Sequence, residues 1–561
     1  MPDATTVGST RQRWCWLAVA LGIVFAALTL SPGYITGIGA FWQRVTGDVA
    51  MGQIGWLYYA HDIWRFPLFA IGNFHLPEGS NLLLSDSLPL IALPAKLLYR
   101  LAWPAGSVPP NYVGLWVAGC LVLQAVAASR LLLALDVRKP ASHIAGVVLF
   151  CYLPMLFLRF GHAGLMGQFF ILLALDGYVR AKRHGLTRRQ WFALCAWPVL
   201  ALMLHPYLAA MSGLLVVTAI LDQWRDGRLD IREVLVRLGS MAAAVLLIVW
   251  IGGFASAAGT GFGDYGLYSL NLLSPFVPLA GTLSGRLLHT TTPDLPGLYQ
   301  WEGACYLGAG VLLLCLAALP SLRNLRAGLR RHLVLAIMLA VVLLFAISNR
   351  VGFGSHELFN VPLPARVIGW LSEFRGSGRF VWIAVYTLLA ALITVVVHRY
   401  RGRSVWLLAA AALLQIVDVA PMQAAVRAAS ARAAEPAIDR TAWRKLIGEH
   451  DRIFEFPSFE CGGLFGRGVP GTRWRVLGID WIAAKLDKPN NSAYQTRYTK
   501  DCARERHDAT SNFGQPGTLY LYRSSQEIGV LLAGHGAITS RCGYLDDVVV
   551  CSASENLSNL R

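Results

Sequence analysis

Acidic, histidine and aromatic side chains gather in one stretch of the chain, between Gly47 and Pro89. The stretch begins GDVAMGQIGWLYYAHDIWRFP and ends SDSLP, and it is too polar to cross a bilayer. Its ionisable side chains include Asp48, His61, Asp62, His75, Glu78 and Asp86. A carboxylate can take a proton from an attacking hydroxyl group that lies within hydrogen-bond reach. Carboxylates among so many aromatic residues indicate chemistry on an amphiphilic substrate at a membrane face.

Two of these carboxylates also have a structural explanation. Asp48 precedes the run AMGQIGWLYYAHDIW, and Asp is a preferred residue at helix N-caps. Asp86 has the same alternative, as a cap on a helix that begins at Leu88. Asp48 and Asp86 could instead share Mg²⁺ or Mn²⁺ with Glu302, because hard cations prefer carboxylate ligands. These carboxylates follow no clear spacing rule, so the sequence predicts no definite metal site or cofactor.

A second group of residues is suited to binding phosphate. Arg375 and Arg379, in the run FRGSGRF, flank a Gly-Ser-Gly turn before an apolar segment. Guanidinium groups match phosphate oxygens with paired hydrogen bonds, and helix N-termini attract anions. The alternative is an exposed pair of arginines beside a membrane helix. Glu302 precedes another apolar segment, where it would bind sugar hydroxyls or hold one of these arginines.

The elements that must position these residues are membrane helices. The chain is 55% apolar and only 14% charged, with mean hydropathy +0.50, whereas soluble chains carry about 25% charged residues. Apolar runs long enough to cross a bilayer recur along the chain. Eleven spans are expected near residues 14–34, 112–135, 141–158, 166–181, 190–205, 207–222, 236–256, 303–321, 332–348, 379–397 and 404–420.

Basic residues predict the orientation of these spans. The segment 87–103 contains prolines, Lys96 and Arg100, and is expected to lie in the interface as a helix. If it does not cross, the strongly basic loops all fall on one side, which the positive-inside rule makes cytoplasmic. The first span is then an uncleaved signal anchor, the N-terminus is inside and the C-terminus outside. The net charge of +17 reflects this topology and contact with anionic lipids, not a nucleic-acid partner.

The cysteines and the composition predict a separate C-terminal domain. Residues 1–420 would form the membrane domain, 421–435 a linker of small residues and 436–561 an exported α/β domain. Its four cysteines predict two disulfides in an exported domain. The hairpin pattern CGYLDDVVVC pairs Cys542 with Cys551, which leaves Cys461 and Cys502.

Patterning within this domain predicts one helix and several strands. The helix is TAWRKLIGEH, and the strands are RIFEFPSF, TRWRVLGIDWIAAKL, GTLYLYRS, IGVLLAG and DDVVV. In the membrane domain, the glycine-rich run GGFASAAGTGFGDYG is expected to be a mobile outer loop, either a substrate lid or a plain connector.

The order of motifs resembles the GT-C superfamily, integral-membrane glycosyltransferases that use polyprenyl-phosphate sugars. The chain is similar, more closely, to a bacterial GT-C-type family. The resemblance covers most of residues 40–400 and rests on GDVAMGQIGW, SDSLPLIALPAK, YVGLWVAGCLVLQA, RFGHAGLMGQ, YSLNLLSPFVP, EGACYLGAG and FRGSGRFVW. It implies a GT-C-like fold in a bacterial inner membrane, with the active site facing the periplasm. The partners implied are a polyprenyl-phosphate sugar donor and a glycan or lipid-linked acceptor.

The resemblance also ranks the candidate residues. The essential acid of GT-C enzymes follows the first span, which implies that Asp48 is the general base of an inverting transfer, with Asp86 second. His162 lies in the second outer loop, where related enzymes contact substrate, and Arg159 is beside it. Their alternative is an interfacial histidine and a snorkelling arginine.

The aromatic side chains of the first loop would stack on sugar faces or form an interfacial belt. Trp56 is the first of them, and His61 would bind substrate or orient the loop. Two other classes of function stay open: a flippase or transporter for lipid-linked glycans, and a scaffold whose outer domain binds glycan.

Overall fold

The computed structural model describes residues 4–43, 46–104, 106–254, 265–432, 438–462, 472–497, 500–511, 514–522 and 541–560. It is mostly helical, with a small sheet in its C-terminal part. The chain divides into two compact units. The helical unit comprises residues 1–35, 114–247 and 261–431, and the mixed unit comprises residues 36–113, 248–260 and 432–561.

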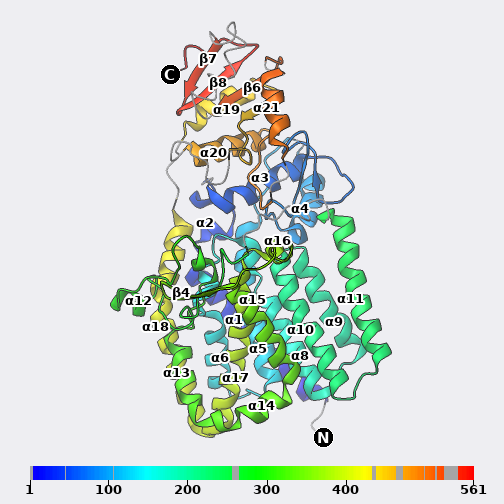
Figure 1. Ribbon diagram of the computed structural model, residues 1–561, viewed down its shortest axis with the longest axis vertical. Helices are drawn as coiled ribbons and strands as arrows, with labels where there is room; N and C mark the ends of the chain where they lie inside the picture. The colour runs from blue at the N-terminus through cyan, green and yellow to red at the C-terminus, as the bar shows by residue number, and fades with distance from the viewer. Residues whose placement is uncertain are drawn as a thin grey trace. The chain divides into compact units, whose positions relative to one another are not determined.

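Long apolar helices make up the helical unit, because a helix satisfies its own backbone hydrogen bonds where water is absent. Figure 1 shows several of them running side by side. The helices are α1 Ala4–Thr29, α2 Pro32–Ile35, α5 Val113–Ala134, α6 Pro140–Cys151, α7 Pro154–Phe157, α8 Phe169–His184, α9 Arg188–Leu202, α10 Pro206–Arg225, α11 Ile231–Gly252, α12 Leu283–Leu287, α13 Ala309–Ala318, α14 Leu325–Arg331, α15 Leu333–Ile347, α16 Ala365–Leu371, α17 Val381–Tyr400 and α18 Ser404–Ala431. A hairpin of β3 Arg350–Phe353 and β4 His356–Asn360 precedes α16.

Several of these helices could span a membrane. Within the described residues, six segments are long and apolar enough. They are Gln12–Thr29, Val113–Ala134, Pro206–Arg225, Ile231–Gly252, Ala309–Arg331 and Ser377–Ala431. The helices Pro140–Cys151 and Leu333–Ile347 are apolar but shorter. Each of the eleven spans expected from hydropathy overlaps helical residues, but the expected span 141–158 is broken into α6 and the four-residue helix α7, which begins at Pro154.

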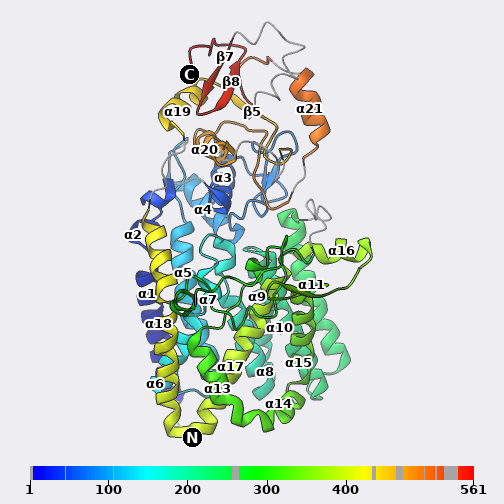
Figure 2. The same ribbon diagram turned by 60° about the vertical axis from the view of Figure 1, so that its left-hand side comes forward.

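Ion pairs and hydrogen bonds tie the basic loops of the helical unit to one another. Arg183, at the end of α8, pairs with Asp136 in the loop after α5. Arg225, at the end of α10, donates a hydrogen bond to the carbonyl oxygen of Arg330 in α14 at 2.9 Å. These loops therefore lie at one end of the helical unit, where α14 is drawn in Figures 1 and 2.

The mixed unit joins the first loop to the C-terminal part of the chain. Its helices are α3 Gly47–His61, α4 Pro89–Ala102, α19 Arg440–Gly448, α20 Thr472–Lys485 and α21 Cys502–Ser511. A short ribbon pairs β1 Ala70–Ile71 with β2 Ser80–Asn81. A four-stranded sheet has the order β5–β6–β8–β7, from β5 Arg452–Phe456, β6 Thr518–Tyr522, β8 Val548–Ser552 and β7 Cys542–Leu545. Strands β5 and β6 are parallel and the other pairs antiparallel.

The C-terminal predictions are mostly confirmed, with one wrong element. The expected helix is α19, and the patterns around β5, β6 and β8 form strands. The run TRWRVLGIDWIAAKL, expected to be a strand, is helix α20 instead. Its β-branched residues suggested a strand, but it is buried on nearly every side, and periodicity cannot separate a buried helix from a buried strand. The run IGVLLAG and most of the glycine-rich run, at residues 255–264, lie outside the described residues.

Both expected disulfides are present in the mixed unit. Cys461 pairs with Cys502, and Cys542 pairs with Cys551 across the β7–β8 hairpin. The segment 421–435 is not a linker along most of its length, because α18 continues to Ala431. Its small residues, mainly alanine, are good helix formers.

Helix α3 packs against α20, far away in the sequence, as both figures show. The indole N–H of Trp481 on α20 donates a hydrogen bond to the side-chain oxygen of Gln53 on α3 at 2.8 Å. On α3, a Cβ atom at Gly55 would lie 2.0 Å from the hydroxyl oxygen of Ser85. Only glycine at position 55 allows the chain around Ser85 to lie this close to α3.

Residues 489–497 run beside the first loop and link it to β5. The Asn490 amide donates to the carbonyl oxygen of Asn73, and the Leu76 amide donates to that of Asn490. Further along, the Thr496 amide donates to the carbonyl oxygen of Leu84 at 2.8 Å. The first loop therefore folds as part of the same unit as the C-terminal sheet.

Candidate functional site

The loop carboxylate expected to act as a base lies in the first turn of α3. Asp48 is half-buried, and its Oδ1 accepts a hydrogen bond from the hydroxyl group of Tyr494 at 2.8 Å. The N-cap of α3 is Thr46, so Asp48 does not cap this helix. An acidic side chain in the first turn still interacts favourably with the helix dipole. The hydrogen bond from Tyr494 restricts the carboxylate while leaving part of it accessible.

The second loop carboxylate, Asp86, lies beside the same helix. Its carbonyl oxygen is 3.4 Å from where a Cβ atom at Gly52 would be, one helical turn after Asp48. Asp86 itself is in the left-handed region, with φ 51°. The N-cap of α4 is Leu88, so the cap explanation fails for Asp86 as well. The loop thus places both acids next to the first two turns of α3.

The other loop carboxylates have structural partners. Asp62 accepts hydrogen bonds from Arg65 and from the Gly72 amide. Burial opposes its ionisation, but these hydrogen bonds outweigh that cost and lower its pKa. Glu78 pairs with Lys500 at 3.2 Å. These two acids support the fold of the loop and are unsuited to a catalytic role.

A buried polar cluster fastens the loop to the C-terminal part. His75 Nε2 lies 3.2 Å from Oε1 of Glu460, which also accepts a hydrogen bond from Gln495. Burial raises the pKa of Glu460, but the hydrogen bond and charge of His75 bring it below its ordinary value. The ammonium group of Lys500 donates to the carbonyl oxygens of Leu76 and Asn491.

The two residues expected to contact sugar are placed inside the mixed unit. Trp56 is 2% exposed, and its indole N–H donates to the carbonyl oxygen of Pro110. His61 Nε2 lies 3.2 Å from the carbonyl oxygen of Ser107, and its Nδ1 lies 3.8 Å from Asp487. These contacts make both side chains part of the packing that supports α3.

In the helical unit, the predicted phosphate-binding residues form a cluster around one buried carboxylate. Glu302 Oε2 accepts a hydrogen bond from Arg159 and two from Arg379, at 3.1 Å from Nε and 2.8 Å from Nη2. Its carbonyl oxygen accepts a further hydrogen bond from Arg159. Burial opposes ionisation of Glu302, but Arg379 and Arg159 hold its pKa well below the usual range.

A histidine adjoins this cluster, and a third arginine, Arg375, lies four residues before Arg379 in the chain. His162 Nε2 lies 4.0 Å from Oε1 of Glu302. The ring of His205 lies 5.2 Å from the ring of Tyr207, over which the guanidinium group of Arg379 lies at 5.1 Å. The guanidinium group of Arg375 lies 5.8 Å from the ring centre of Tyr268. Two arginines, Arg159 and Arg379, therefore hold a single buried glutamate.

The positions of these residues along the chain place the cluster at the end opposite the basic loops. Arg159 follows α6 and α7, and Arg379 precedes α17, whereas the basic loops lie at the other ends of those helices. Close approach of the backbone brings the two sides together, because a Cβ atom at Gly378 would lie 2.7 Å from the Cα atom of Gly303. Glu302 is next to Gly303 in the chain and Arg379 is next to Gly378, so this close approach lets their side chains form a hydrogen bond.

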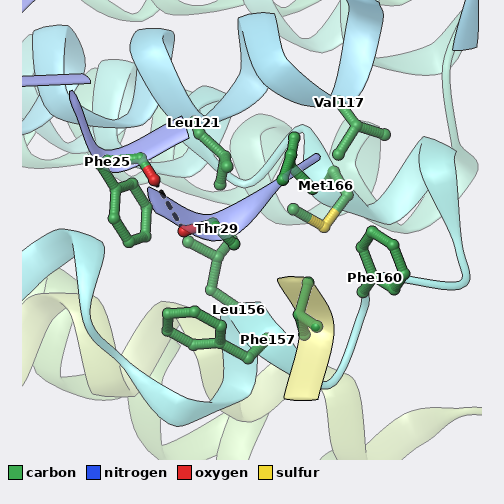
Figure 3. Close-up of a pocket in the computed structure, with 10 residues that line it drawn as sticks. Phe25, Thr29, Val117, Leu121, Leu156, Phe157, Phe160 and Met166 are labelled. Atoms are coloured by element: carbon green, nitrogen blue, oxygen red, sulfur yellow. Dashed lines mark hydrogen bonds between the residues drawn. The ribbon is translucent and has the colours of Figure 1, made fainter. Parts of the chain in front are cut away.

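A small apolar cavity lies next to Arg159 in the chain. Figure 3 shows it between α1, α5 and the segment that contains Phe157 and Phe160. The hydroxyl group of Thr29 in its lining donates to the carbonyl oxygen of Phe25 at 2.7 Å. The segment from 157 to 162 thus presents phenylalanine to the cavity and Arg159 to the cluster.

Within the described residues, no group of three or more His, Cys, Asp or Glu side chains is arranged to hold a metal ion. The carboxylate of Glu302, one of the three expected cation ligands, accepts hydrogen bonds from arginines instead.

Sequence reasoning missed residues that lie far away in the chain from their partners. Tyr494 is 446 residues from Asp48. Tyr207, whose hydroxyl oxygen accepts from the Gly376 amide at 2.6 Å, is 169 residues from it. The run NNSAY, from Asn490 to Tyr494, did contain a signal, because several polar residues in a row must find hydrogen-bond partners if the fold buries them, as it does here.

Comparison with known families gives two matches. The family model described as domain of unknown function DUF6311 matches residues 19–420. The model described as the DUF6311 C-terminal domain matches residues 442–553. No curated protein matches the chain.

Proposed function

The chain belongs to the DUF6311 family, and we propose that it is a membrane glycosyltransferase of the GT-C type. It would move a sugar from a polyprenyl-phosphate donor to a periplasmic or lipid-linked glycan acceptor. The observation that carries this proposal is the arginine cluster around Glu302. Such a cluster suits the phosphate group that leaves the sugar, because preorganised cationic donors stabilise developing negative charge.

The surroundings of the cluster support a lipid-linked anion. Two apolar side chains, Phe157 and Phe160, flank Arg159 in the chain, although the cavity that they help to line has room for only about one water molecule. A polyprenyl phosphate needs both kinds of contact, a cationic one for its head group and an apolar one for its tail. In this proposal Arg375 and Arg379 bind the phosphate, while Glu302 holds Arg379 and Arg159 in place.

Asp48 is the proposed general base. It would take the proton from the acceptor hydroxyl as that oxygen attacks the sugar carbon and the carbon–phosphate oxygen bond breaks. A single direct displacement inverts the configuration at that carbon. The hydrogen bond from Tyr494 supports this role, because it fixes the orientation of the Asp48 carboxylate, which is half-buried in the first turn of α3. Asp86 is a secondary candidate.

The proposed setting is the inner membrane of a bacterium. Eleven spans with an internal N-terminus and an external C-terminus would put the basic loops in the cytoplasm. The Arg159–Glu302 cluster would then face the periplasm. Helix α4 would lie in the interface, because it exposes Leu97, Leu98 and Leu101 on one face.

A transfer assay tests the proposal. Purified protein in lipid nanodiscs would be supplied with polyprenyl phosphate carrying a radiolabelled hexose or pentose. Envelope glycans from cells that lack the protein would serve as acceptors. The wild type should transfer label, and Asp48→Asn should lose it by roughly 10²–10⁴-fold, as expected for a general base. Asp451→Asn, an exposed position in the same unit, is the matched control. Full activity of Asp48→Asn would rule out the assigned base.

A further inference from the structure

A group of basic side chains on the mixed unit lies apart from the residues assigned above. Arg440 and Arg444 are one helical turn apart on α19, and Lys485 ends α20. The ammonium group of Lys485 lies 3.5 Å from the ring centre of Trp481, and the guanidinium group of Arg440 lies 5.5 Å from the same ring. We call these three cations and Trp481 the α19–α20 patch.

The patch carries charge that other side chains do not neutralise. Across the described ranges, no carboxylate forms an ion pair with Arg440, Arg444 or Lys485 at 4.0 Å or less. Arg440 donates instead to the backbone carbonyl of Gln43. Burial, together with the charges of Arg440 and Arg444, lowers the pKa of Lys485 to about 8. Like charges crowded beside an indole ring indicate a place where an anion is favourable.

The chain holds this patch within reach of a membrane at two points. Arg440 is nine residues after Ala431, the last residue of the apolar segment Ser377–Ala431, so at most about 30 Å of extended chain separates them. Gln43 is 14 residues after Thr29, the last residue of the apolar helix α1. In the segment between them Ile38 is 85% exposed, as expected for a side chain that contacts lipid.

We propose that the α19–α20 patch binds the phosphate group of an anionic membrane lipid. Guanidinium groups pair with phosphate oxygens, and basic residues close to a membrane attract anionic head groups. Trp481 provides the flat surface against which Arg440 and Lys485 are arranged. The bound lipid would fasten the mixed unit to the bilayer surface. This site is separate from the donor site proposed for the Glu302 cluster.

The experiment uses the whole protein in a zwitterionic detergent-lipid micelle. Dioctanoyl phosphatidylglycerol, dioctanoyl phosphatidylcholine and inorganic phosphate are added separately, and lipid binding is measured by native mass spectrometry and thermal unfolding. Phosphatidylglycerol should bind and raise the unfolding temperature, and the two other additives should not. The variant with Arg440→Gln, Arg444→Gln and Lys485→Gln should lose roughly a hundredfold in affinity, since each basic residue near a membrane contributes about 1 kcal/mol.

The matched control removes the same charge elsewhere on the mixed unit. Lys445→Gln, Arg452→Gln and Arg504→Gln change three exposed positions outside the patch, and this variant should bind phosphatidylglycerol like the wild type. Equal losses in the two triple variants would overturn the site, because net charge alone would explain them. Stabilisation by inorganic phosphate at the same concentration would overturn the assignment to lipid.

Discussion

Replacing Glu302 by Gln tests whether the arginine cluster serves only the fold or also binds an anion. The substitution keeps the shape of the side chain and removes its charge. In the wild type the carboxylate accepts one hydrogen bond from Arg159 and two from Arg379. The side chains of Arg159, Glu302 and Arg379 are 2%, 7% and 14% exposed, so water replaces little of what is lost.

The expected cost is about 3 kcal/mol of unfolding free energy. Removing one partner of a buried ion pair costs about 3–5 kcal/mol. The amide oxygen of Gln can still accept one hydrogen bond, and the carbonyl oxygen at 302 keeps its contact with Arg159. Both effects place the expected loss of unfolding free energy at the lower end of this range of about 3–5 kcal/mol. The measurement is unfolding of the purified protein by dodecyl sulfate in mixed micelles, followed by circular dichroism.

The pH dependence should have a definite sign. The arginines hold the pKa of Glu302 below its ordinary value of 4.5, so ionised Glu302 stabilises the folded state at neutral pH. This contribution is present above the unfolded pKa and is lost as the pH falls below about 4.5 toward the folded value. The stability difference between the wild type and Glu302→Gln should therefore shrink on acidification below that pH.

Anion binding separates the two roles of the cluster. Loss of one negative charge beside Arg159 and Arg379 should tighten binding of farnesyl phosphate by roughly tenfold, from a Coulomb term of about 1–4 kcal/mol that solvent partly screens. Glu357→Gln is the control, because Glu357 pairs with Arg350 at 2.6 Å on a more exposed hairpin, and surface pairs contribute about 0–1 kcal/mol. The reasoning is refuted if Glu302→Gln matches this control in stability, or if its affinity for farnesyl phosphate does not rise.

Three further outcomes are expected. Tyr494→Phe should slow transfer by roughly tenfold or more without weakening donor binding, since a hydrogen bond to a charged group such as Asp48 contributes about 1.5–3 kcal/mol; initial rates and donor saturation measure this. Replacing Cys461 and Cys502 by Ala should lower the free energy of unfolding by about 4 kcal/mol, because their disulfide closes a loop with sequence separation 41. Urea unfolding of the whole protein, followed by a probe in the mixed unit, measures this loss. Gly55→Ala should cost about 1–3 kcal/mol through overpacking, seen as a lower unfolding temperature.

Each of these has an outcome that contradicts it. An unchanged transfer rate in Tyr494→Phe would mean that the hydrogen bond from Tyr494 to Asp48 does not contribute to catalysis. Loss of the Cys542–Cys551 bond, with sequence separation 9, should cost less, about 3 kcal/mol. The reverse order would refute the loop-entropy argument. A Gly55→Ala protein as stable as the wild type would mean that the chain around position 85 can move away from α3.

The sequence was sufficient to locate most of the long helices of the helical unit, because an apolar run of sufficient length has few alternatives to a helix. It also predicted the cysteine pairs and the residues of the Arg–Glu cluster. It failed for α20, where burial on nearly every side erased the periodicity that distinguishes a helix. It could not predict that Tyr494 meets Asp48 or that Glu460 meets His75, because such pairs depend on the packing of segments more than 380 residues apart.

The composition of the mixed unit has a consequence for how the protein is made. Its first part ends at residue 113 and most of the remainder begins at residue 432. A ribosome working at about 5–20 residues per second needs roughly 15–60 s to synthesise what lies between. During that interval α3 has no α20 to pack against, and His75 has no Glu460. The first loop therefore stays incompletely folded until the C-terminal part of the chain has been synthesised. A chain that stops before residue 432 should therefore be a substrate for quality-control proteases even though most of its membrane helices are complete.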